Sequence, residues 1–151
     1  MAGEDFYEAA VRHWIDGIIL EEQKEYDNAV CMQGFAAECA LKKIMEKVRS
    51  IKMRDSDEIE KYKKGYSHLG EAMMRDIQIM LLVDMELLAI LEPSCALKLS
   101  KMELPHILFQ DHPERRYFRD GTYTKADAED CRKAADSLIK EMLYMRVDGY
   151  L

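Results

Sequence analysis

The chain has 151 residues, 34% of them charged, and a formal net charge of −7 at neutral pH. This length fits one domain with its own hydrophobic core, so we treat residues 1–151 as a single domain. The acidic balance works against broad, non-specific binding to nucleic acid. The first residues carry no basic leader, and no uncharged run approaches the roughly 18 residues that cross a bilayer. We therefore expect a cytoplasmic protein with no signal peptide and no membrane segment.

Residues that favour helices dominate the composition. Only three prolines interrupt a chain rich in Ala, Leu, Met, Glu and Lys: Pro93, Pro105 and Pro113. We predict an all-α fold, specifically an antiparallel up-and-down bundle of four to five helices.

The N-terminal third predicts two long helices. The first covers about Phe6–Lys24, with Asp5 as its N-cap. The second begins at Tyr26 or Asp27 and continues to about Arg49. This second helix is apolar over so much of its girth that we expect it at the centre of the bundle. Residues 50–65 are rich in Lys and Asp without an apolar face, which predicts a flexible connection.

The remaining sequence predicts two more helices, an ordered loop and a final helix. The apolar period runs over about Leu69–Leu91, and a shorter helix follows over Ser94–Leu104. Prolines, a glycine and clustered aromatic and charged residues indicate an ordered loop at about 105–123. Thr124-Lys-Ala-Asp127 has the pattern of a capping box that opens the last helix.

Five short segments, spread from about Ala9 to Leu143, form a recognisable set: Ala9-Ala-Val-Arg-His-Trp14, Glu25-Tyr-Asp-Asn-Ala29, Gly34-Phe-Ala-Ala-Glu-Cys-Ala-Leu-Lys42, Gly65-Tyr-Ser-His-Leu69 and Arg116-Tyr117. Together they resemble the HEPN family, small helical-bundle domains named for their occurrence in higher eukaryotes and prokaryotes and for nucleotide binding. The segment from Gly34 to Lys42 is the most specific. Its small residues are expected to let neighbouring helices approach closely, while Phe35 fills the gap between them.

The resemblance implies a bundle that often dimerises. Family members include ribonuclease toxins, subunits paired with antitoxins or nucleotidyltransferases, and domains that only bind. The catalytic members carry an Arg, then four to six residues, then a His, and no histidine of this chain has that spacing: His13, His68, His106 and His112. We therefore predict a non-catalytic subunit, a homodimer without a cofactor, that binds a nucleotide or an RNA phosphate. A ribonuclease with a displaced active site and a pure protein-interaction module, partnered by a nucleotidyltransferase or an antitoxin, stay open as alternatives.

The predicted ligand-binding residues lie mainly in the loop at 105–123. Guanidinium groups grip phosphate bidentately and a tyrosine stacks on a base, which favours Arg115, Arg116, Tyr117 and Arg119. His68 joins them because a helix begins at this point, where backbone N–H groups favour an anion. The competing interpretation is that an arginine of this loop pins it to the bundle through a buried acid.

Two further residues are predicted to have a structural role. Glu38 and Lys42 are four residues apart on the second helix and are expected to form an ion pair. Glu38 lies among small apolar residues, so we expect a second partner for it, such as Arg116. We predict no metal site, because His106, His112 and Asp111 share a loop without a ligand spacing and the four cysteines lie singly.

Overall fold

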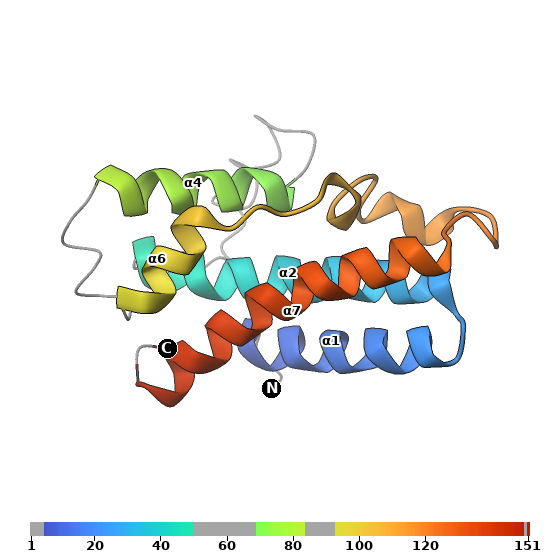
Figure 1. The fold of residues 1–151 in the computed structure, drawn as a ribbon, viewed down its shortest axis with the longest axis horizontal. Coiled ribbons are helices and arrows are strands. Elements are labelled where there is room, and N and C mark those ends of the chain that lie inside the picture. Colours follow the sequence, from blue (N-terminus) through green and yellow to red (C-terminus); the bar gives the residue numbers. More distant parts are fainter. Residues whose placement is uncertain (1–4, 50–68, 84–92, 150) are drawn as a thin grey trace.

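The computed structural model describes residues 5–49, 69–83, 93–149 and 151. It is an all-α helical bundle without a strand in these described residues, which confirms the predicted fold class. The helices, labelled as in Figure 1, are α1 (Phe6–Glu22), α2 (Tyr26–Arg49), α4 (Leu69–Val83), α6 (Pro93–Lys101) and α7 (Lys125–Val147), with two short 3₁₀ helices between the last two, η1 (His106–Leu108) and η2 (Glu114–Tyr117).

The first helix begins at the predicted Phe6 and ends at Glu22, two residues before the predicted Lys24. The Asp5 carboxylate accepts from the Glu8 N–H at 3.0 Å, so Asp5 is the N-cap of α1. At the other end Lys24 has a φ of 63°, a left-handed conformation that cannot continue the helix. The Glu25 N–H then donates back to the Leu20 carbonyl at 2.8 Å, which closes the turn into α2.

The last helix opens with the predicted capping box. Thr124 Oγ1 accepts from the Asp127 N–H at 3.2 Å, and the Asp127 carboxylate accepts from the Thr124 N–H at 2.9 Å. The preceding helix, α6, ends at Lys101, earlier than the predicted Leu104. Gln78 of α4 stabilises this end of the helix, because its Nε2 donates to the carbonyls of Leu99 (3.0 Å) and Met102 (2.7 Å).

Three predictions fall outside the described residues. These are the flexible connection at 50–65, the extension of the third helix from 84 to Leu91, and the ligand role of His68.

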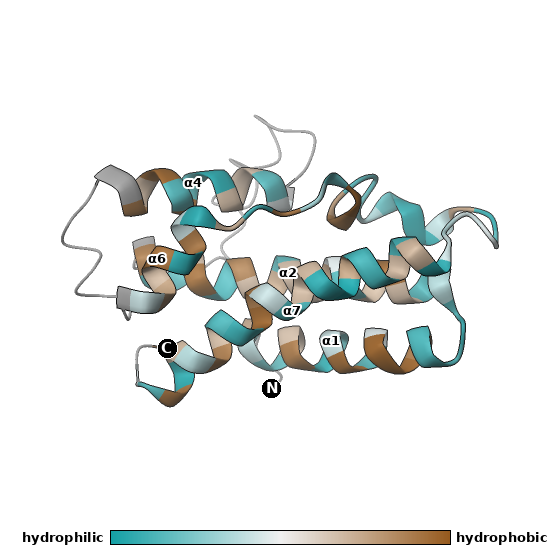
Figure 2. Cartoon of the chain, viewed as in Figure 1, coloured by the Kyte–Doolittle hydropathy of each residue, from teal (hydrophilic) through white to brown (hydrophobic). Residues whose placement is uncertain are grey.

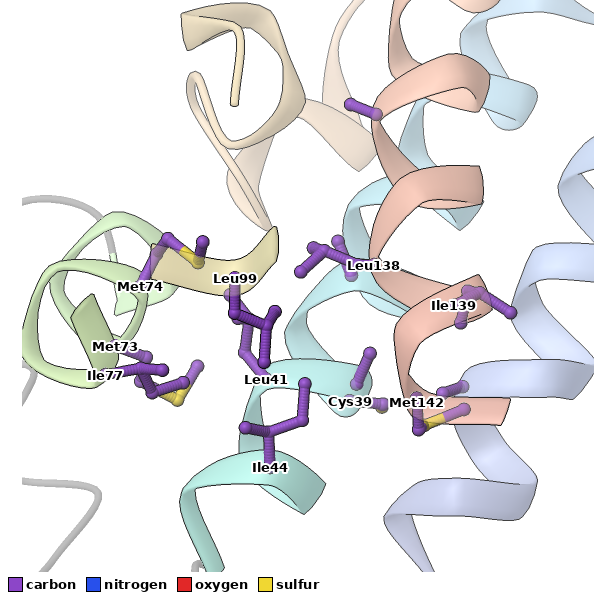
Figure 3. Packing of buried hydrophobic residues seen from close by; sticks show 14 of the residues in the cluster. Cys39, Leu41, Ile44, Met73, Met74, Ile77, Leu99, Leu138, Ile139 and Met142 are labelled. Carbon is purple, nitrogen blue, oxygen red and sulfur yellow. The ribbon is translucent and has the colours of Figure 1, made fainter. Parts of the chain in front are cut away.

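The core is assembled around α2, as its wide apolar surface predicts. Figure 1 shows α1 antiparallel to α2, and α7 packs along both of them. Helix α4 packs on α2, and α6 contacts both α4 and α7. Figure 3 shows side chains from four helices meeting in one cluster, among them Leu41 and Ile44 (α2), Met73 and Ile77 (α4), Leu99 (α6), and Leu138 and Met142 (α7).

The amphipathic pattern of the helices decides which side chains face solvent and which, including the cysteines, are buried. Hydrophobic and hydrophilic residues alternate along α1 and α7 with the period of a helix that buries one side (Figure 2). All four cysteines are buried and free, and burial raises the pKa of Cys39 to about 11 and that of Cys131 to about 12. No helix in the described ranges is long and apolar enough to cross a membrane.

Candidate functional site

The loop at 105–123 is packed onto the bundle. Its two 3₁₀ helices both contact α2, and η1 also contacts α7. Leu108 and Phe109 are buried in the core, so the first part of the loop is held by apolar contacts. Asp27 of α2 holds the second part, because its carboxylate accepts from the N–H groups of Gly121 (2.7 Å) and Tyr123 (2.8 Å). The loop therefore has fixed ends on both sides of η2.

Arg115 is the polar anchor of this loop. Its side chain is buried, and Nη1 donates to the carbonyls of Ile107 (2.6 Å) and Gln110 (3.1 Å). Nη2 donates to the carbonyls of Leu108 (2.6 Å) and Val30 (3.1 Å). No carboxylate of the described residues lies within ion-pair distance of this guanidinium, so carbonyl dipoles take the place of a counter-ion. The structure thus separates Arg115, predicted as a phosphate ligand, from the surface.

Gly34 makes room for this anchor. A Cβ at Gly34 would lie 2.5 Å from Arg115 Nη2 and 2.8 Å from His112 Nδ1. Gly34 was expected to bring two helices together; instead it admits the loop to the surface of α2. The close approach of two helices occurs at Gly17 of α1, where a Cβ would collide with the Gln33 side chain of α2.

The predicted Glu38–Lys42 pair is present, and its second partner is a histidine. Lys42 Nζ lies 3.6 Å from Glu38 Oε2, and His112 Nε2 lies 3.7 Å from Glu38 Oε1, the place that Arg116 was expected to take. Burial alone would raise the pKa of Glu38, but the His112 ring and the Lys42 ammonium outweigh it and hold this pKa below its ordinary value. Phe35 packs edge-on against His112, with ring centroids 4.6 Å apart. This cluster joins the loop to α2.

The exposed part of the loop, residues Arg116–Arg119, is called the loop tip below. Tyr117 is 76% exposed and Phe118 is 44% exposed, both high values for aromatic side chains. The Arg116 guanidinium lies 4.9 Å from the centre of the Tyr117 ring, an arrangement that aligns the cation with the ring face. Arg116 and Arg119 are also exposed, and the acids Glu114 and Asp120 flank the tip on either side. The tip therefore offers two cations and two rings without forming a broad basic surface.

The first part of the loop forms one wall of a cleft against α4. This cleft has a volume of about 510 Å³, and Glu71, Arg75 and His106 are among the residues that line it. His106 Nδ1 lies 3.1 Å from Glu71 Oε1, so the carboxylate orients the imidazole. His106 does not meet His112 at a metal site: within the described ranges no group of His, Cys, Asp and Glu could hold a metal ion.

Several residues of this site were not singled out for it from the sequence. His112 was considered only as a metal ligand, and Phe118 was not considered at all. Gly34 carried a usable signal, because a glycine inside a helix costs about 1 kcal/mol relative to alanine and indicates a close approach. Phe118 also carried a signal, because it lies between Tyr117 and Arg119, two residues that the sequence had already selected.

Arg115, Asp27 and the Glu38 cluster fix the base of the loop, and the tip presents hydrogen-bond donors and aromatic rings to solvent. Comparisons of the chain with protein-family models, with curated proteins and with solved structures find no match.

Proposed function

We propose that this protein is a HEPN-type, non-catalytic binding subunit whose loop tip recognises a nucleotide or an RNA phosphate. The observation that carries the proposal is the pairing of Arg116 with the exposed ring of Tyr117 on an anchored loop. A guanidinium donates two parallel hydrogen bonds to a phosphate, and an exposed aromatic ring stacks on a base. Both functions are available within one short stretch of chain.

The anchoring of the loop supports this proposal energetically. Ordering a mobile side chain on binding costs about 0.5–1.5 kcal/mol, and ordering a mobile loop adds to this cost. Buried hydrogen bonds already hold this loop in the free protein, so binding loses less conformational entropy of the backbone. The flanking acids limit attraction to arbitrary polyanions, which fits recognition of one or two phosphates. His68 remains a predicted contributor to the same ligand.

A thermal-shift screen against nucleoside mono-, di- and triphosphates and short single-stranded RNAs tests the proposal. A ligand at 100 times its dissociation constant should stabilise the fold by about 2.7 kcal/mol. The shift should shrink in Arg116→Lys, because lysine cannot bind phosphate in the bidentate geometry. The melting temperature of the free protein should not change, since Arg116 is exposed.

A matched control is available on the last helix. Arg146 is also exposed and stacks on a tyrosine, with its guanidinium 5.0 Å from the Tyr7 ring, but it lies outside the loop. Arg146→Lys should leave the ligand-induced shift intact. The absence of a shift with every ligand, or an equal loss in both variants, would count against the loop tip as the binding site.

The expected homodimer has a candidate interface on α1 and α7. A groove of about 450 Å³ there is lined by the apolar side chains of Tyr7, Val11, Ile15 and Leu143. Three charged residues of alternating sign border it: Glu8, Arg12 and Asp16. In a two-fold arrangement each Arg12 can face an acid of the other copy, which is the self-complementarity that such an interface requires. We therefore assign this face to a second copy of the chain.

The ribonuclease alternative is favoured by one observation, the Glu71–His106 pair beside Arg75 in the cleft. An imidazole oriented by a carboxylate can act as a general base, and a nearby guanidinium can stabilise charge on a phosphate. This alternative predicts cleavage of single-stranded RNA in the presence of a chelator, and its loss in His106→Ala. Intact RNA after prolonged incubation with the wild-type protein supports the binding subunit instead.

A further inference from the structure

A second cleft is lined by residues from the end of α6 and from the C-terminal half of α7. Figure 1 shows these two segments at the opposite end of the bundle from the loop tip. The volume of the cleft is about 560 Å³, and α7 contributes Ser137, Lys140 and Glu141 to its lining. These three residues are spaced i, i+3 and i+4, so they share one face of the helix. Glu141 follows Lys125, the first residue of α7, by 16 positions, which places it about 24 Å along the helix from the loop.

Glu141 is an unusual residue for this position, because its carboxylate is buried without a full set of partners. The residue is only 5% exposed. Its Oε1 lies 3.6 Å from Lys98 Nζ, but Oε2 has no hydrogen-bond partner in the described part of the chain. Burying a carboxylate costs several kcal/mol, and buried polar atoms are almost always hydrogen-bonded. Glu141 lines the cleft, and its Oε2 is enclosed by protein atoms, so a ligand can supply the missing donor only after a covering side chain moves aside.

The same cleft gathers positive charge in an acidic protein. The lining holds Lys98 and Lys101 of α6 and Lys140 of α7, and its acids among the described residues are Glu103 and Glu141. Lys98 already has an anion in Glu141 at 3.6 Å, whereas Lys101 and Lys140 form no ion pair with any described residue. A phosphate monoester carries a charge of about −1.5 to −2 near neutral pH, whereas a carboxylate carries −1. The lysines therefore favour a phosphate.

We propose that this cleft binds a small phosphorylated polyol, with its phosphate on the three lysines and a hydroxyl donating to Glu141. Lys98 is 58% exposed, so its side chain can turn from Glu141 to the phosphate and open the carboxylate to the ligand. Ser137 Oγ donates to the Lys133 carbonyl at 3.1 Å, which leaves its lone pairs to accept from a second hydroxyl. The volume lies within the usual range of small-molecule sites.

A pair of matched ligands tests this proposal on the full chain. Glycerol 3-phosphate carries the phosphate and two hydroxyls, and n-propyl phosphate carries the phosphate alone. Titration of each into ¹⁵N-labelled protein should shift amide signals of Lys98, Lys101 and Lys140. Glycerol 3-phosphate should bind at least about tenfold more tightly, because its hydroxyl adds a hydrogen bond to a charged group. Equal affinities, or shifts spread over unrelated surfaces, would overturn the proposal.

Variants separate the two halves of the site. Lys140→Ala should weaken both ligands by about tenfold, and Glu141→Gln should remove the preference for glycerol 3-phosphate while propyl phosphate still binds. Ser137→Ala, at an exposed position, repeats the test of the hydroxyl contacts without touching the buried carboxylate. Lys133→Ala is the control, because this exposed lysine of α7 is not in the cleft. An equal effect of Lys133→Ala and Lys140→Ala would show general charge attraction and no site.

This site is independent of the loop tip. Arg116→Lys should leave the glycerol 3-phosphate titration unchanged, so failure of one proposal does not decide the other.

Discussion

Arg115 and Arg116 are neighbours in the chain with opposite environments. In a 3₁₀ helix successive side chains are about 120° apart, so when one points into the bundle the next points to solvent. Arg115 reaches the carbonyl of Val30 across the space that Gly34 leaves, and Arg116 stacks on Tyr117 outside. A sequence of consecutive arginines does not say which of them turns inward, because that depends on the position of α2.

Replacing the anchor should destabilise the whole domain. Lysine keeps the charge of Arg115 but lacks the planar fork that reaches four carbonyls. We expect Arg115→Lys to lower the free energy of unfolding by about 2–3 kcal/mol, measured by urea denaturation. Arg116→Lys is the paired control and should change it by less than about 0.5 kcal/mol. Equal effects of the two substitutions would contradict the assignment of the anchor.

The Glu38 cluster should make stability depend on pH in the acid range. The pKa of Glu38 is held below its ordinary value of 4.5 in the folded protein. The unfolded chain therefore takes up this proton first as the pH falls, and the stabilisation is present above about pH 4.5 and is lost below it as the folded pKa is passed. The difference in unfolding free energy between wild type and Glu38→Gln should shrink as the pH falls below about 4.5. A difference that grows below this pH would contradict this account.

At the scale of elements, the loop and α2 are held together where Gly34 faces Arg115 and His112. Gly34→Ala improves helix propensity by up to about 1 kcal/mol but overpacks this contact at a cost of about 1–3 kcal/mol. We expect a net loss of about 1–2 kcal/mol in chemical denaturation. The same substitution in an Arg115→Ala background should cost less, because the nearest atom has gone. Additive effects would show that Gly34 does not serve the anchor.

The helices could be predicted from local signals, whereas the site required tertiary contacts. Asp5 and the Thr124–Asp127 box marked the starts of α1 and α7 because capping involves only residues within one turn. The end of α6 was missed because the residue that caps its last carbonyls, Gln78, belongs to another helix. His112, the second partner of Glu38, was missed because it lies in the loop, far from Glu38 in the sequence. Glu141 was left unremarked although it lies three residues after Leu138 and next to Met142, both on the buried stripe of α7.

At the scale of the whole molecule, the exposed apolar face of α1 should decide the oligomeric state. Ile15 is 45% exposed beside the groove, and Ile79 is 51% exposed on α4, outside it. Light scattering should give the wild-type protein twice the chain mass of 17.6 kDa. Ile15→Glu should produce a monomer because it buries a charge in the apolar interface, whereas Ile79→Glu should remain a dimer. A monomeric wild type, or dissociation by both substitutions, would contradict this interface.

The binding proposal depends on the ring that the anchored loop exposes. Fluorescence anisotropy with a short single-stranded RNA and the Tyr117→Ala variant tests it most directly, because Tyr117 is 76% exposed and its removal should not affect folding. A stacked base contributes about 1–3 kcal/mol, so affinity should fall by roughly 5- to 150-fold, while Tyr117→Phe, which keeps the ring, should stay close to wild type. Unchanged RNA affinity in Tyr117→Ala would contradict the loop tip as the recognition site.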